Sequence, residues 1–165
     1  MLQWLGETAS HGKLRLFACA CARHLWHLPL DNRCRNAVET AERFVAGLAT
    51  TAELRAACDA AYDTHQDIVN GRRHPSQVWD PYTLAPQACA CCAGVDAPSA
   101  AFATARYVAD VLTCSAGADV GMDPEDPGFD QALSHVRAKE ERIQADLLRD
   151  IFGLVPGDST DGEKR

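Results

Sequence analysis

The sequence predicts an all-α protein that folds as one domain, a bundle of about five helices. Apolar residues recur at intervals of three and four along most of the chain, and glycines and prolines fall at the ends of these runs. No segment alternates apolar and polar residues as a half-buried strand would. A chain of 165 residues with 47% hydrophobic side chains can build one core. We expect the helical domain to span residues 1–154 and the polar segment 155–165 to be a flexible tail.

The first expected helix runs from Leu14 to Leu28 and is the central one. Its apolar residues lie on more than one side, which indicates burial by several neighbours, and Pro29 ends it. A second helix follows Asp31, a plausible N-cap, and stops near Gly47. Charged residues at four-residue steps lie opposite its apolar stripe, so this helix should keep one exposed face.

A capping box of Thr50 and Glu53 predicts the start of a third helix, which runs to Gly71. Its apolar face includes His65, which we expect to be a hydrogen-bonded core histidine. The same helix carries acidic residues at four-residue steps: Asp59, Asp63 and Asp67. We expect this column to be solvated rather than to perform acid–base chemistry.

Residues 72–85 are expected to form an ordered but irregular connection, because prolines interrupt the helical pattern there. A short segment rich in alanine and cysteine follows at 86–93, and a further helix begins at Pro98. A linker rich in glycine, proline and acidic residues is expected at 119–127.

The last expected helix starts after Asp126 and ends before Gly153, packed along the first helix. Its apolar residues predict one buried stripe: Phe129, Leu133, Val136, Ile143, Leu147 and Ile151.

The composition excludes several partners. The net charge of −7 disfavours binding to nucleic acid, which needs a basic surface. No apolar stretch is long enough to span a membrane, and the first residues do not read as a secretion signal. We therefore expect a cytoplasmic protein, with a protein partner and with its eight cysteines reduced.

Four blocks of sequence resemble a family of planctomycete bacterial proteins. They are KLRLFACAC at 13–21, WHL at 26–28, AVETAER at 37–43 and QADLLRDIFG at 144–153. The resemblance implies a bacterial protein. Because that family has no known activity, ligand or catalytic residue, it implies no function.

Helix geometry selects a candidate metal site among the cysteines. Successive helical residues turn by about 100°, so Cys19 and Cys21 face nearly opposite sides and cannot share an ion. Cys21 and His24 can share a face, as can Cys89 and Cys92. Together these four would suit tetrahedral zinc, and copper is an alternative.

Packing is the competing interpretation of the thiols. Cys21, Cys34 and Cys58 fall on apolar stripes, where a free cysteine behaves as a small hydrophobe. Residues 89–92 contain three thiols, which is more than the packing of small side chains between helices requires. That segment, however, lacks the second spaced pair of a zinc ribbon and the βαβ context of a thioredoxin-like motif.

The sequence contains no phosphate-binding glycine loop, nucleophile elbow or HExxH motif. It therefore favours a non-enzymatic helical interaction or regulatory module, with a partner surface that includes residues 79–82. One alternative is a metal-binding helical protein that uses Cys89 and Cys92. The other is a thiol-dependent enzyme or redox sensor, in which Cys91 or Cys92 would be exposed and have a low pKa.

Overall fold

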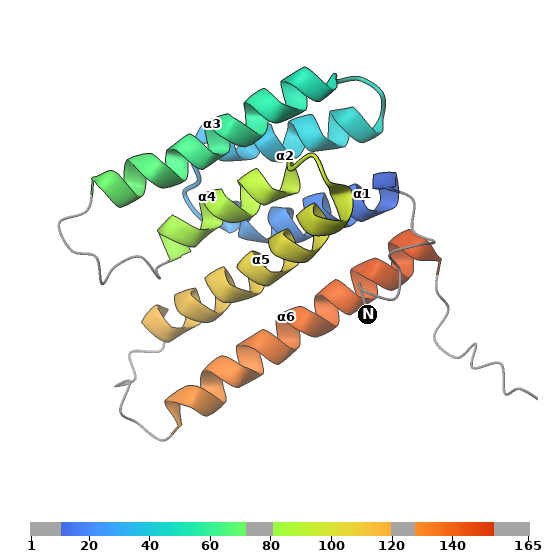
Figure 1. Cartoon of the computed structure of the whole chain (residues 1–165). Helices are drawn as coiled ribbons and strands as arrows, with labels where there is room; N and C mark the ends of the chain where they lie inside the picture. Colours follow the sequence, from blue (N-terminus) through green and yellow to red (C-terminus); the bar gives the residue numbers. More distant parts are fainter. Residues whose placement is uncertain (1–10, 72–80, 120–127, 154–165) are drawn as a thin grey trace, which may run out of the picture.

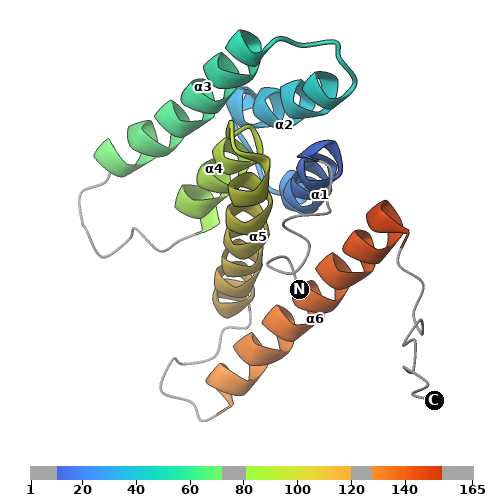
Figure 2. The ribbon, with the colours of Figure 1, turned by 45° about the vertical axis from the view of Figure 1, so that its right-hand side comes forward.

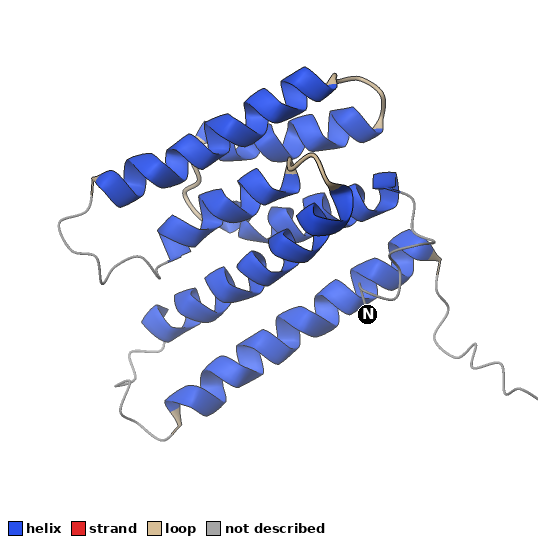
Figure 3. Cartoon of the chain, viewed as in Figure 1, coloured by secondary structure: helices blue, strands red, loops and turns tan. Residues whose placement is uncertain are grey.

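The computed structural model describes residues 11–71, 81–119 and 128–153. These ranges contain six α-helices and one 3₁₀ turn and no strand (Figure 3). The elements are α1 (His11–Arg23), η1 (His24–His27), α2 (Asn32–Val45), α3 (Thr51–Asn70), α4 (Pro81–Cys92), α5 (Ala97–Asp119) and α6 (Phe129–Phe152). The all-α prediction is confirmed, and the expected number of helices was close to the six observed.

The helices are arranged around α1, α4 and α5, which contact one another. Helices α2 and α3 lie side by side on one flank, and α6 runs along α5 on the other (Figure 1). A view turned by 45° shows the same order, with α6 farthest from α3 (Figure 2). The last helix packs more extensively on α5 than on α1, to which the sequence assigned it.

Several helices begin or end at the capping residues that the sequence predicted. The carboxylate of Asp31 accepts a hydrogen bond of 2.8 Å from the backbone N–H of Arg33, as an N-cap does. Thr50 and Glu53 form the complete capping box at the start of α3. At the end of α6, Gly153 adopts a left-handed conformation with φ of 69°, which favours glycine.

Two expected boundaries were wrong. The first helix is α-helical only to Arg23 and tightens into η1 before Leu28. Residues 81–85, expected to be irregular, form the first turn of α4, because a proline at the first helical position costs no hydrogen bond. The rest of that connection, 72–80, lies outside the described residues, as do 120–127 of the linker and the expected tail at 155–165.

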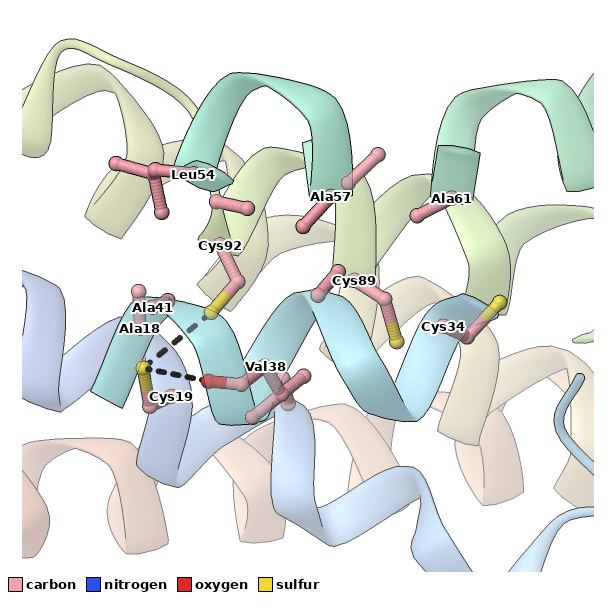
Figure 4. Close-up of a cluster of buried hydrophobic side chains, with 14 residues drawn as sticks. Ala18, Cys19, Cys34, Val38, Ala41, Leu54, Ala57, Ala61, Cys89 and Cys92 are labelled. Carbon is pink, nitrogen blue, oxygen red and sulfur yellow. Dashed lines mark hydrogen bonds between the residues drawn. The ribbon is translucent and has the colours of Figure 1, made fainter. Parts of the chain in front are cut away.

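Helix α1 separates two cores. Phe17, Cys21 and Leu25 pack toward α4, α5 and α6. Ala18 and Cys19 face the other way, toward α2, α3 and α4, in a core rich in alanine and cysteine (Figure 4). This arrangement confirms that the first helix is covered on more than one side.

The buried face of α6 differs from the predicted stripe. Ile143 is 37% exposed, whereas the carboxylate-bearing Glu140 is only 3% exposed. A pattern of apolar residues could not reveal this difference, because Glu140 is buried beside His24 of η1 and Gln144 of α6 itself.

Candidate functional site

The last turn of α4 points three cysteines toward three different helices. Cys89 and Cys92 are buried and Cys91 is half-buried. Each one has a cysteine of another helix as its neighbour. Cys89 lies near Cys34 of α2, Cys91 near Cys58 of α3 and Cys92 near Cys19 of α1. Helix α4 is therefore the centre of a set of thiols that converge from four helices.

In one of these pairs, Cys19 and Cys92, the Sγ atoms lie 3.4 Å apart (Figure 4). The Sγ of Cys19 also lies 3.9 Å from the carbonyl oxygen of Val38. If Cys19 donates its S–H to that oxygen, Cys92 donates to Cys19. Donation to Cys19 and then burial raise the pKa of the Cys92 thiol well above its usual range.

The other thiols on α4 are also held in their protonated form. The neighbouring Cys34 and then burial raise the pKa of Cys89, and burial raises the pKa of Cys91 to about 11. Cys58 donates its S–H to the carbonyl oxygen of Ala90 at 3.2 Å. Thiolate nucleophiles with lowered pKa, as the redox-sensor alternative requires, are therefore not found at Cys91 and Cys92.

The structure does not bring the four predicted metal ligands together. Cys21 lies in the core with α5 and α6, whereas Cys89 and Cys92 lie in the core with α2 and α3. His24 pairs with a carboxylate instead. Within residues 11–71, 81–119 and 128–153, no three His, Cys, Asp or Glu side chains are placed to hold one ion. The reason is that the last turn of α4, which carries Cys89 and Cys92, packs on the Cys19 side of α1, opposite Cys21.

A polar cluster joins η1 to α5 and α6. His24 Nδ1 lies 3.0 Å from Oε1 of Glu140. Gln144 donates to the same carboxylate oxygen at 2.9 Å and to the carbonyl of Ala105 at 3.0 Å. The hydrogen bond to Glu140 raises the pKa of His24, which favours an ion pair.

This cluster does not activate a nucleophile. Burial, and then the charge of Glu140, raise the pKa of Cys21 far above its usual range. A thiol in that environment stays protonated, whereas a nucleophilic cysteine needs a lowered pKa. Neither the histidine–carboxylate pair nor its buried position could be predicted from the spacing of Cys21 and His24.

Arg15 is a second buried polar group that sequence reasoning missed. It is 3% exposed, and its guanidinium donates hydrogen bonds to three carbonyl oxygens at and just after the end of α4. The acceptors are Cys92 at 3.0 Å, Gly94 at 2.7 Å and Val95 at 3.0 Å. Arg15 thus satisfies carbonyls that a helix end leaves unpaired, and it ties α4 to α1. The only hint of its burial in the sequence was its position between Leu14 and Leu16.

The polar residues predicted on α3 are found in structural roles. His65 is half-buried, and its Nδ1 lies 2.8 Å from the carbonyl oxygen of Thr83, which confirms a hydrogen-bonded histidine. The three aspartates of the column are exposed, as expected. Asp67 accepts a hydrogen bond of 2.9 Å from Arg33 of α2.

An open groove with a volume of about 590 Å³ lies between α5 and α6. Its lining combines aromatic and small apolar residues with a charged rim: Phe17, Phe102, Ala105, Arg106, Ala109, Arg137, Glu141, Gln144, Ala145 and Leu148. Phe102 is 53% exposed at its edge. We call this feature the α5–α6 groove.

Part of the predicted partner surface lies elsewhere. Pro81 and Tyr82 form the start of α4, and Trp79 and Asp80 lie outside the described residues. Tyr82 is 53% exposed and borders a smaller hollow of about 430 Å³ with Pro86 and Ile68. The sequence thus identified an exposed aromatic residue at a hollow, but it missed the larger groove.

The chain matches no protein-family model, no curated protein and no solved structure. The resemblance to planctomycete proteins stays a prediction. None of the described helices has both the length and the apolar character needed to cross a bilayer.

Proposed function

We propose that the chain is a non-enzymatic interaction module that binds an amphipathic helix of a partner protein in the α5–α6 groove. The supporting observation is the exposed ring of Phe102 beside a concave surface of small apolar side chains. Large aromatic side chains are usually buried, and an exposed apolar groove with a polar rim is typical of a protein-binding site. Two neighbouring helices with alanines between them leave space for the apolar face of a third.

The charges at the rim indicate the chemistry of the partner. Arg137 donates to Asp110 at 2.6 Å and so occupies that carboxylate. Arg106 lies 3.9 Å from the same carboxylate, and its side chain is 59% exposed. Its guanidinium is therefore available to donate hydrogen bonds to a carboxylate of a bound partner. We expect the bound helix to carry an Asp or Glu that pairs with Arg106, beside apolar residues spaced by three and four.

The protonation of Cys21 and Cys91 disfavours thiol catalysis at these two positions. Burial raises the pKa of Cys21 and Cys91, so little thiolate is present at neutral pH. The half-buried His24 pairs with the buried Glu140 on α6, and neither residue lines the groove.

Photo-crosslinking followed by a binding assay tests this proposal. The photoreactive residue benzoylphenylalanine replaces Glu141 on the rim in the full chain, expressed in the source cells, and the cross-linked protein is identified by mass spectrometry. The purified partner is then titrated against the wild-type chain, Phe102→Asp and the control Tyr62→Asp. Tyr62 is 46% exposed on α3, away from α6.

We expect the cross-linked segment to be an amphipathic helix with an acidic residue. Phe102→Asp should weaken its binding about thirty-fold, as loss of an interface hot spot does, and Tyr62→Asp should leave it unchanged. The proposal fails if the adduct is a second copy of this chain, or if Phe102→Asp binds as tightly as the wild type.

A further inference from the structure

We propose that Cys19 and Cys92 are a modification site at which a peroxide converts two core thiols into a disulfide between α1 and α4. This inference does not depend on the proposed function, because the pair lies in the core with α2 and α3 rather than at the groove. It rests on the contact between the two sulfur atoms and on the way their helices are held together.

The two sulfur atoms are already close to bonding distance. They lie 3.4 Å apart, and a disulfide needs about 2.05 Å, so the atoms must approach by only ~1.4 Å. Figure 4 shows the two side chains pointing toward each other from their separate helices. Rotation of both side chains about their Cα–Cβ bonds is the movement that would bring the sulfurs together.

Arg15 fixes the backbone around the pair. It precedes Cys19 by one helical turn, and its guanidinium donates to the carbonyl oxygen of Cys92 at 3.0 Å. The same side chain holds Gly94 and Val95, so the end of α4 is fastened to α1 next to the two sulfurs. The thiols therefore stay in contact in the folded chain instead of meeting only by chance.

The hydrogen-bond geometry suggests a role for each sulfur. Either thiol can donate in the contact between them, but the Sγ of Cys19 also lies 3.9 Å from the carbonyl oxygen of Val38. We therefore take Cys19 as the donor to Val38, Cys92 as the donor to Cys19, and Cys19 as the sulfur that attacks the peroxide. In the first step an S–O bond forms at Cys19, the O–O bond breaks, and water leaves with the thiol proton. In the second step the sulfur of Cys92 attacks Cys19, the S–O bond breaks, and a second water leaves with the Cys92 proton. Two thiols and one hydrogen peroxide thus give one disulfide and two waters.

Burial decides which oxidant can act. Cys19 is 1% exposed and Cys92 is fully buried. A small uncharged peroxide can enter such a core, whereas a bulky disulfide such as oxidised glutathione cannot reach either sulfur in the folded chain. The reaction should therefore be slow and selective, and it would record sustained oxidation rather than a brief pulse.

The test oxidises the folded, reduced full chain with hydrogen peroxide, then unfolds it and alkylates the remaining thiols. Mass spectrometry counts the alkylated cysteines and locates the linked pair by fragmentation. We expect two of the eight thiols to escape alkylation and the linked residues to be Cys19 and Cys92. After treatment with oxidised glutathione at the same concentration, all eight thiols should still be alkylated.

Cys21→Ala is a matched control, because Cys21 is equally buried on the same helix but faces the other core. It should form the disulfide as the wild type does, whereas Cys19→Ala and Cys92→Ala should not. The fragment assignment in the wild-type chain remains decisive if either variant fails to fold. The inference is overturned if folded wild type keeps eight alkylatable thiols, or if the linked residues are any other two.

Discussion

The imidazole of His24 lies 3.0 Å from the carboxylate of Glu140, which is buried at the contact between η1 and α6. The two residues are 116 positions apart, so their pairing joins the beginning and the end of the described fold. Gln144 adds a hydrogen bond to the same carboxylate. The docking of α6, and with it one wall of the α5–α6 groove, therefore depends in part on the protonation of His24.

We expect the stability of the fold to fall as His24 loses its proton. The pKa of His24 is raised by Glu140, so the unfolded chain releases this proton at lower pH than the folded chain. The contribution of the pair is therefore complete below about pH 6.5, the value of unfolded histidine, and is lost as pH rises through the folded pKa. Urea unfolding between pH 6 and pH 9 measures this loss.

Glu140→Gln should remove this pH dependence and destabilise the chain by about 1.5–3 kcal/mol at pH 6, the contribution of a hydrogen bond to a charged group. Glu141→Gln is the control, since the neighbouring Glu141 is exposed. An unchanged slope of stability against pH in Glu140→Gln would show that the pair does not titrate as described.

Arg15→Met should be among the most destabilising single changes. It removes three hydrogen bonds and leaves carbonyl oxygens at the end of α4 without their donor, so we expect a loss of about 3 kcal/mol or more. Chemical denaturation measures the change.

Arg23→Met is the comparison for Arg15→Met. The Arg23 side chain is 41% exposed and pairs with Glu42, and surface pairs contribute about 1 kcal/mol or less. Equal losses in the two variants would contradict a special role for Arg15.

The capping box at α3 predicts a smaller effect. Thr50→Ala removes the side-chain acceptor for the backbone N–H of Glu53, and loss of such a cap costs about 1 kcal/mol. Thr51→Ala, one residue later and exposed, should cost much less. Thermal unfolding of both variants compares them, and a larger loss in Thr51→Ala would show that the cap is not the stabilising element.

If the Cys19–Cys92 disulfide forms, it should stabilise the chain. It would close a loop between residues 73 positions apart, and the loop-entropy estimate for that length is about 4 kcal/mol. Denaturation of oxidised and reduced wild type measures the gain, with Cys19→Ala as the control that should show none. Lower stability after oxidation would mean that closing the bond strains the core.

Features determined by neighbouring residues could be predicted from the sequence. Thr50 and Glu53 define a helix start within four residues, and Gly153 marks a helix end by its conformational freedom. Pro81 was misread because a proline that breaks one helix also fits the first position of another.

Features that depend on which helices meet could not be predicted. Helix periodicity separated Cys19 from Cys21, but it could not show that α4 would pack on the Cys19 side. The burial of Glu140 likewise depends on its contact with His24 of η1, which lies 116 positions away in the sequence. The groove has the same origin, since Phe102 and Ala145 belong to helices whose contact no local pattern specifies.

The most direct test of the proposed function is amide hydrogen exchange of the full chain, with and without the partner helix identified by cross-linking. Binding in the α5–α6 groove predicts slower exchange in residues 102–109 of α5 and 137–148 of α6, with α3 unchanged. Slower exchange confined to the hollow beside Tyr82, or no change in α5 and α6, would contradict it.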